Sequence, residues 1–182
     1  SQINKNTPAL VNNWKNNNAI ICGIPTSGIY FGRAIGETLD ISYQQFITKR
    51  PDYPYRTFIL KNTADRLEAC KKKFQAEPDL IKNKIIILVD DSIVRGTTLK
   101  YLIKFMELYE PKEIHFISGS PPVKYPCYYG MDFPDIEDLI ANQISKEKMV
   151  KDYGLTSLTY LDIESLKDIF KEVKFKGDMC NA

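Results

Sequence analysis

The sequence predicts an α/β fold, with a mainly parallel, twisted sheet flanked by helices. Short apolar runs alternate along the chain with segments whose apolar residues recur at helical spacing. The run 84–89, Lys-Ile-Ile-Ile-Leu-Val, shows no alternation of apolar and polar residues. That pattern is typical of a central parallel strand covered on both faces. Strands that alternate with helices in this way imply β–α–β units.

Each further element follows from a local pattern. The apolar run 19–24 ends at Pro25 and predicts a buried strand. Residues 99–106 carry apolar side chains at the spacing of an amphipathic helix, which Pro111 ends. Other strands are predicted at 42–47, 113–118 and 158–161. Other helices are predicted at 28–39, 63–74, 136–141, 146–153 and 163–173, the last one capped by Asp162.

Composition limits the classes of function. The 182 residues carry 25 basic and 23 acidic side chains, a net charge of +2, so we expect no nucleic-acid partner. No apolar run approaches the ~20 residues that cross a bilayer, and residues 1–10 are polar, so we expect no membrane association. The four cysteines lie far apart, which favours a reducing, cytoplasmic location. We expect one domain, 1–182, with a core at 20–161 and a C-terminal helix and tail at 162–182.

The most informative stretch is the decapeptide 89–98, Val-Asp-Asp-Ser-Ile-Val-Arg-Gly-Thr-Thr. Asp90 and Asp91 stand at the carboxyl end of the central strand, where open α/β sheets bind ligands. The Gly-Thr-Thr loop and the helix N-terminus after it suit a phosphate monoester. Adjacent carboxylates suit the vicinal hydroxyls of a sugar, or a divalent cation that carries phosphates. A phosphorylated ribose combines these features.

Two alternatives compete with this phosphate site. Asp90 and Asp91 could be ordinary strand-end residues, with Thr97 only a helix N-cap. A phosphoacceptor receiver domain also has an acidic pair after a strand, normally its first strand. Here residues 1–84 precede that strand, and a receiver domain leaves the Gly-Thr-Thr loop unexplained. The phosphorylated-ribose hypothesis accounts for both the pair and the loop.

The decapeptide 89–98 resembles the 5-phosphoribosyl 1-pyrophosphate (PRPP) motif of type I phosphoribosyltransferases. Its inner part, 92–97, resembles that of the amidophosphoribosyltransferases. Three further parts of the chain are similar to the same family: 23–27 to its pyrophosphate-side loop, 56–59 to the start of its mobile catalytic loop, and 120–130 with 137–141 to a segment specific to it. The resemblance covers the chain from about residue 20 to the C-terminus.

The resemblance implies the type I phosphoribosyltransferase fold and a glycosyltransferase reaction. PRPP and ammonia would give 5-phosphoribosylamine and pyrophosphate, the first committed step of purine synthesis. Asp90 and Asp91 would hold the ribose diol, directly or through Mg²⁺, and Ser27 with Gly28 would lie on the metal and pyrophosphate side. The family usually has an acidic residue before Ser27, where this chain has Thr26. The 5′-phosphate would be held by the amides and hydroxyls of Ser92, Ile93, Val94, Arg95, Gly96, Thr97 and Thr98.

Basic residues around the mobile-loop segment are the candidate catalytic residues. Lys49, Arg50 and Arg56 could neutralise the charge of the leaving pyrophosphate. For Lys49 and Arg50 the alternative is a solvated basic pair. Arg66 and Lys73 could fold onto the substrate, or could belong to an exposed helix face.

The only histidine is expected to have a structural role. His115 lies in a strand pattern, which favours a side chain on a sheet face. With a single histidine, a Ser-His-Asp or Cys-His mechanism is not expected.

Some members of the family hold a 4Fe–4S cluster, and Cys127 and Cys180 fall on two of its ligand positions. Because such a cluster needs four thiolates, we expect one only if the chain is a fragment of a longer protein. The whole family enzyme also has an N-terminal glutaminase domain, which does not fit before residue 20. We therefore expect the chain alone to use ammonia rather than glutamine.

The resemblance further implies purine nucleotides as feedback ligands and a homo-oligomer. The alternative function is a regulatory module that binds PRPP or a nucleotide without turnover. Thr26 and three altered mobile-loop residues, Asp65, Ala69 and Cys70, favour this alternative.

Overall fold

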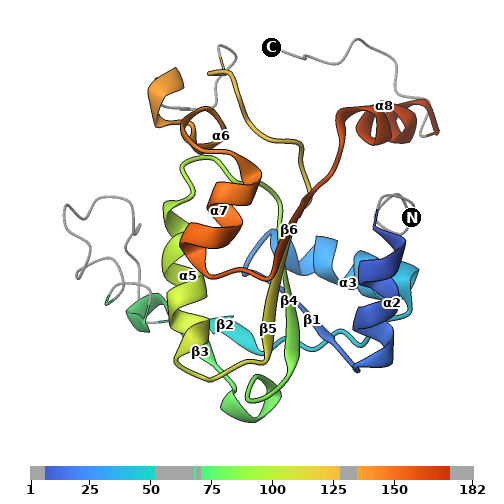
Figure 1. The fold of residues 1–182 in the computed structure, drawn as a ribbon, viewed down its shortest axis with the longest axis vertical. Coiled ribbons are helices and arrows are strands. Elements are labelled where there is room, and N and C mark those ends of the chain that lie inside the picture. The colour runs from blue at the N-terminus through green and yellow to red at the C-terminus, as the bar shows by residue number, and fades with distance from the viewer. Residues whose placement is uncertain (1–6, 52–67, 69–70, 128–134, 173–182) are drawn as a thin grey trace.

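The computed structural model describes residues 7–51, 68, 71–127 and 135–172. Its main sheet has four strands, all parallel, in the order β1-β4-β5-β6 (Figure 1). The strands are β1 (Ile20–Gly23), β4 (Ile85–Asp90), β5 (Glu113–Ser118) and β6 (Ser157–Tyr160). The predicted α/β class with a parallel sheet is confirmed. Since the strands are parallel, all four carboxyl ends lie at one edge of the sheet.

Helices cover both faces of this sheet (Figure 1). One face carries α2 (Pro8–Asn16) and α3 (Gly28–Leu39), and the other carries α5 (Thr97–Glu107) and α7 (Lys146–Tyr153). Successive side chains of a strand point to opposite faces, and all five apolar residues of β4 are buried. Those on one face pack in the cluster of α5 and α7, and those on the other pack in the cluster of α2 and α3. This two-sided burial explains the uninterrupted apolar run.

A separate antiparallel pair joins β2 (Ile47–Lys49) to β3 (Phe74–Ala76), with Lys49 opposite Phe74. Ile47 and Phe74 are buried in the same hydrophobic cluster as α5, so this small sheet packs on the main body. Among the described residues, the remaining elements are the 3-10 turns η2 (Pro78–Leu80) and η3 (Ile136–Asp138), and the helices α6 (Ile140–Gln143) and α8 (Ile163–Glu172). Among the described helices, none has the length and apolar character of a membrane-spanning segment.

Most predicted elements occur within one or two residues of their expected bounds. The cap of α8 is confirmed, because the Ser165 amide donates to Asp162 Oδ1 at 2.8 Å. The strand predicted at 42–47 is wrong in its bounds: only Tyr43 forms an isolated bridge, to Ile21, and β2 begins at Ile47. Most of the helix predicted at 63–74 lies outside the described residues, and its last residue, Phe74, belongs to β3 instead.

Helix α2 is an element that the local sequence pattern does not predict. Its side chains Val11 and Trp14 are only 1% and 0% exposed, and they pack with β1 and β4 in the cluster of α2 and α3. Helix α2 is therefore part of the hydrophobic core.

Candidate functional site

The acidic pair lies at the carboxyl end of β4, as expected. Asp90 is the last residue of the strand and is half-buried, whereas Asp91 is exposed. The Asp91 amide donates to Asp90 Oδ1 at 3.0 Å. Burial, together with the side-chain hydrogen bond and charge of Asp91, raises the pKa of the Asp90 carboxyl from 3.8 to about 8. At neutral pH Asp90 therefore holds a proton that an arriving cation would displace.

The loop between β1 and α3, residues 24–27, lies against this pair. The Ile24 amide donates to the Val89 carbonyl at 2.8 Å, and Ser27 Oγ donates to Asp91 Oδ1 at 2.9 Å. The close approach requires glycine at position 28, where a Cβ atom would lie 2.2 Å from the Val89 oxygen. The structure thus brings Ser27, Gly28, Asp90 and Asp91 together, although they come from two distant parts of the sequence.

Residues 92–98, here called the phosphate loop, connect the pair to α5. Gly96 precedes the first helical residue and has φ +67°, in the left-handed region that favours glycine. The amides of the first turn of α5, which begins at Thr97, have no intrahelical acceptor and can therefore bind an anion. Thr98 is exposed, whereas the side chain of Ile93 is only 3% exposed and packs in the core. Ile93 can therefore contribute its backbone amide but not its side chain.

The helices that follow residue 135 support the phosphate loop from behind, a contact that no local pattern predicts. The Ile140 amide donates to the Val94 carbonyl at 2.9 Å. A Cβ atom on Gly96 would lie 2.9 Å from the Tyr153 hydroxyl oxygen and 3.0 Å from Ile140 Cγ1. The Arg95 guanidinium lies 3.6 Å from the Asp138 carboxylate in η3.

Basic side chains reach the same edge of the molecule from β2 and from the residues before β3. Lys49 Nζ donates to Thr26 Oγ1 at 2.8 Å, directly beside Ser27. The Arg50 amide donates to the Lys73 carbonyl at 2.9 Å. The positive charge of Lys73 acts to lower the pKa of Asp90, so this ammonium lies within electrostatic reach of the pair. Arg56 and Arg66 lie outside the described residues.

Oxygen atoms are the available metal ligands at this site. Within the described ranges no group of three or more His, Cys, Asp or Glu side chains could hold a metal ion. The two carboxylates and the Ser27 hydroxyl nevertheless suit Mg²⁺, which binds few protein oxygens and takes the rest from water and phosphates. A cation bound here would offset the burial and the charge of Asp91, which together raise the pKa of Asp90. The residues therefore fit Mg²⁺.

The two cysteines expected at cluster positions are described only in part. Cys127 is half-buried in the segment after β5, and Cys180 lies outside the described residues. Burial raises the pKa of the Cys22 thiol to about 12, which disfavours the thiolate that a cluster needs.

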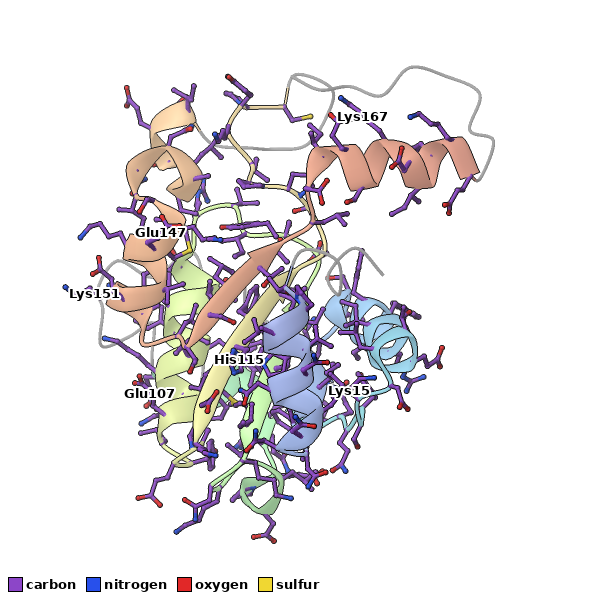
Figure 2. All side chains as sticks on the ribbon, turned by 45° about the vertical axis from the view of Figure 1, so that its right-hand side comes forward. Lys15, Glu107, His115, Glu147, Lys151 and Lys167 are labelled. Carbon is purple, nitrogen blue, oxygen red and sulfur yellow. The ribbon has the colours of Figure 1, made fainter. Side chains whose placement is uncertain are left out.

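His115 is on a sheet face, as predicted (Figure 2). It is 0% exposed, and its ring nitrogens contact Glu113 Oε2 at 3.0 Å and Ser157 Oγ at 2.7 Å. The Trp14 ring packs edge-on against it, with centroids 5.2 Å apart. Burial lowers the pKa of His115, and Glu113 opposes that shift. The histidine therefore joins β5, β6 and α2 within the core.

Comparison with known proteins gives consistent matches over most of the chain. The family model for the phosphoribosyl transferase domain matches residues 2–118. The amidophosphoribosyltransferase of Homo sapiens is 37% identical over 158 residues, which is 86% of this chain and 30% of the relative. That of Methanocaldococcus jannaschii is 35% identical over 147 residues, 81% of this chain and 31% of the relative.

A solved structure is similar as well. Glutamine PRPP amidotransferase from Bacillus subtilis, complexed with ADP and GMP, matches with a TM-score of 0.73 at 32% identity. The match covers 90% of this chain and 35% of that one. The chain thus spans about a third of the length of the proteins that it matches.

Proposed function

The chain belongs to the phosphoribosyl transferase domain family, and we propose that it transfers the phosphoribosyl group of PRPP to ammonia. The products are 5-phosphoribosylamine and pyrophosphate, the first committed step of purine synthesis. One observation carries the proposal: Ser27 from the first loop meets Asp91 of the acidic pair at 2.9 Å, and the phosphate loop continues directly from that pair. The similarity to amidophosphoribosyltransferases over most of the chain supports it.

The phosphate loop would bind the 5′-phosphate of PRPP. The amides that open α5 and the partial positive charge of the helix N-terminus favour a phosphate there. Ser92, Thr97 and Thr98 would add their hydroxyls, while Ile93, Val94, Arg95 and Gly96 would contribute backbone amides. The support from Ile140 and Tyr153 keeps the loop in the shape that this binding needs.

The acidic pair would bind the ribose diol of PRPP. Carboxylate oxygens accept hydrogen bonds from hydroxyl groups, and the two side chains lie next to each other. Asp90, Asp91 and Ser27 would also hold Mg²⁺, which supplies positive charge to the ribose hydroxyls and the pyrophosphate oxygens. The Ser27 hydroxyl, bonded to Asp91, would orient that carboxylate toward the ligand.

The reaction breaks the bond between the anomeric carbon and the pyrophosphate oxygen. The nitrogen lone pair of ammonia forms the new C–N bond with inversion, the pyrophosphate leaves with the bonding electrons, and the nitrogen loses a proton. Lys49, Arg50 and Arg56 would stabilise the negative charge that develops on the leaving group. Lys73, whose charge reaches Asp90, would belong to the same set of cations. Catalysis would thus depend on positioning and electrostatics.

Residues 1–182 would act as one phosphoribosyltransferase domain in the cytoplasm. A glutaminase domain would supply ammonia from glutamine in the whole enzyme, and the assembly would be a homo-oligomer. Purine nucleotides would act as feedback ligands; the Bacillus subtilis relative, which was solved with ADP and GMP, supports this.

Pyrophosphate release from PRPP tests the proposal. The purified chain with Mg²⁺ should release pyrophosphate with ammonia, at a rate that rises with pH as NH₄⁺ loses its proton. It should release none with glutamine, because the glutaminase domain would supply ammonia only in the whole enzyme. Binding of PRPP without release with either donor would contradict catalysis and favour the non-catalytic module.

A further inference from the structure

A neutral side chain holds a lysine at the loop beside the acidic pair. Lys49 Nζ donates to Thr26 Oγ1 at 2.8 Å, although the two residues are 23 positions apart in the sequence. The next residue, Ser27, donates its hydroxyl to Asp91 Oδ1 at 2.9 Å. Two successive hydroxyls of one loop therefore contact groups of opposite charge, Thr26 a cation and Ser27 an anion.

The neutrality of Thr26 decides what the lysine can do. A carboxylate at position 26 would pair with the ammonium and cancel most of its charge. A hydroxyl accepts a hydrogen bond from one of the three N–H groups of the ammonium. The lysine then keeps its full charge and two donors for another partner. Among the described residues, no ion pair within 4.0 Å includes Lys49.

We infer that Thr26 is a positioning residue, which holds the Lys49 ammonium where it binds the pyrophosphate group of the substrate. The inference rests on the proposed function. Because Ser27 bonds to Asp91 and Thr26 is its neighbour, a pyrophosphate bound beside Ser27 would lie within reach of the Lys49 ammonium. Thr26 acts through Lys49 and needs no contact with the substrate itself.

A double-mutant cycle tests this coupling, with inorganic pyrophosphate and Mg²⁺ as the probe in titration calorimetry. Thr26→Val keeps the side-chain shape and removes the acceptor, so it should weaken binding about tenfold, as expected for a hydrogen bond to a charged group. Lys49→Met should weaken binding at least as much. The double variant should bind within about twofold of Lys49→Met, because Thr26 has no further effect once the Lys49 ammonium that it positions is absent. Thr26→Ser should restore nearly wild-type affinity.

Two controls separate positioning from damage to the fold. Thr38→Val removes a hydroxyl of the same kind, which bonds only to the Ala34 carbonyl within α3, and should leave pyrophosphate binding unchanged. Ribose 5-phosphate probes the phosphate loop. The Thr26→Val variant should bind it within about twofold of wild type, because Thr26 is not part of that loop and distant sites act independently.

Four outcomes would overturn the inference. Losses that multiply in the double variant would mean that Thr26 and Lys49 act independently. Equal losses for pyrophosphate and ribose 5-phosphate would mean that Thr26→Val disrupts the loop. Wild-type protein that binds neither probe would overturn the proposed function as well. A Thr26→Val variant that binds both ribose 5-phosphate and pyrophosphate as wild type does would overturn the inference alone.

Discussion

Replacing Asp90 with asparagine should stabilise the ligand-free chain, and the stabilisation should grow as the pH rises. Burial, together with Asp91, raises the pKa of Asp90 from 3.8 to about 8. A carboxyl whose pKa is higher in the folded state binds more protons when folded than when unfolded. The wild-type chain therefore loses stability as the pH rises from the unfolded pKa toward the folded one. Asparagine keeps the Oδ1 acceptor for the Asp91 amide and carries no charge.

The size of the effect follows from the two pKa values. One pKa unit corresponds to about 1.4 kcal/mol of free energy. A group with a folded pKa near 8 should cost the wild type about 2 kcal/mol of unfolding free energy between pH 6 and pH 8. The Asp90→Asn chain lacks this loss, so the difference in stability between the two proteins should grow by the same amount.

Urea unfolding at both pH values, without Mg²⁺ or PRPP, measures this difference. Trp14 is the single tryptophan and is 0% exposed, so its fluorescence reports loss of the core. Asp79→Asn is the control, because it removes an exposed carboxylate in η2. The difference in unfolding free energy between this variant and wild type should be the same at both pH values. A difference between Asp90→Asn and wild type that stays constant from pH 6 to pH 8, or a variant less stable than wild type at pH 8, would refute the reasoning.

Three further sets of substitutions test the contacts of the site and the core. Asp90→Asn combined with Asp91→Asn should weaken Mg²⁺-dependent PRPP binding by roughly tenfold or more, because charges and acceptors are lost together; equal affinities in titration calorimetry would contradict the site. Gly96→Ala should cost ~1–2 kcal/mol from its left-handed backbone alone, and more because its Cβ would press on Tyr153; urea unfolding checks this, and an unchanged midpoint would count against it. Burial lowers the pKa of His115 from 6.5, so wild-type stability should fall as the pH drops below about 6.5. His115→Gln should show a flatter profile between pH 7 and pH 5, and parallel profiles would contradict a buried neutral histidine.

Elements with a complete local signal could be predicted from the sequence, and those that depend on distant partners could not. The predicted ranges 28–39, 113–118 and 146–153 coincide with α3, β5 and α7, because each has its own apolar pattern. Helix α2 has an asparagine-rich second half, and it is held by Val11 and Trp14 packing on the sheet. The helical pattern at 63–74 includes Phe74, which instead pairs with Lys49 across an antiparallel contact that local periodicity cannot reveal.

The same division applies to the candidate site. The acidic pair and the phosphate loop occupy one continuous stretch, so the order of their residues alone predicts a phosphate site. The hydrogen bonds from Ser27 to Asp91 and from Lys49 to Thr26 join separate stretches, and only the folded chain brings their partners together. The burial of the Ile93 side chain also depends on the fold, because the motif alone does not say which residues of a loop turn inward.

The support behind the phosphate loop links two regions of the gene that must change together. Gly96 has no room for a Cβ atom because Ile140 and the Tyr153 hydroxyl already occupy that space. A side chain at position 96 is strained by its left-handed backbone in any case, and the crowding adds to that strain unless a smaller residue stands at 140 or 153. Positions 96, 140 and 153 should therefore covary among descendants of this sequence, and residues beyond the 2–118 match should constrain the motif as strictly as its own neighbours do.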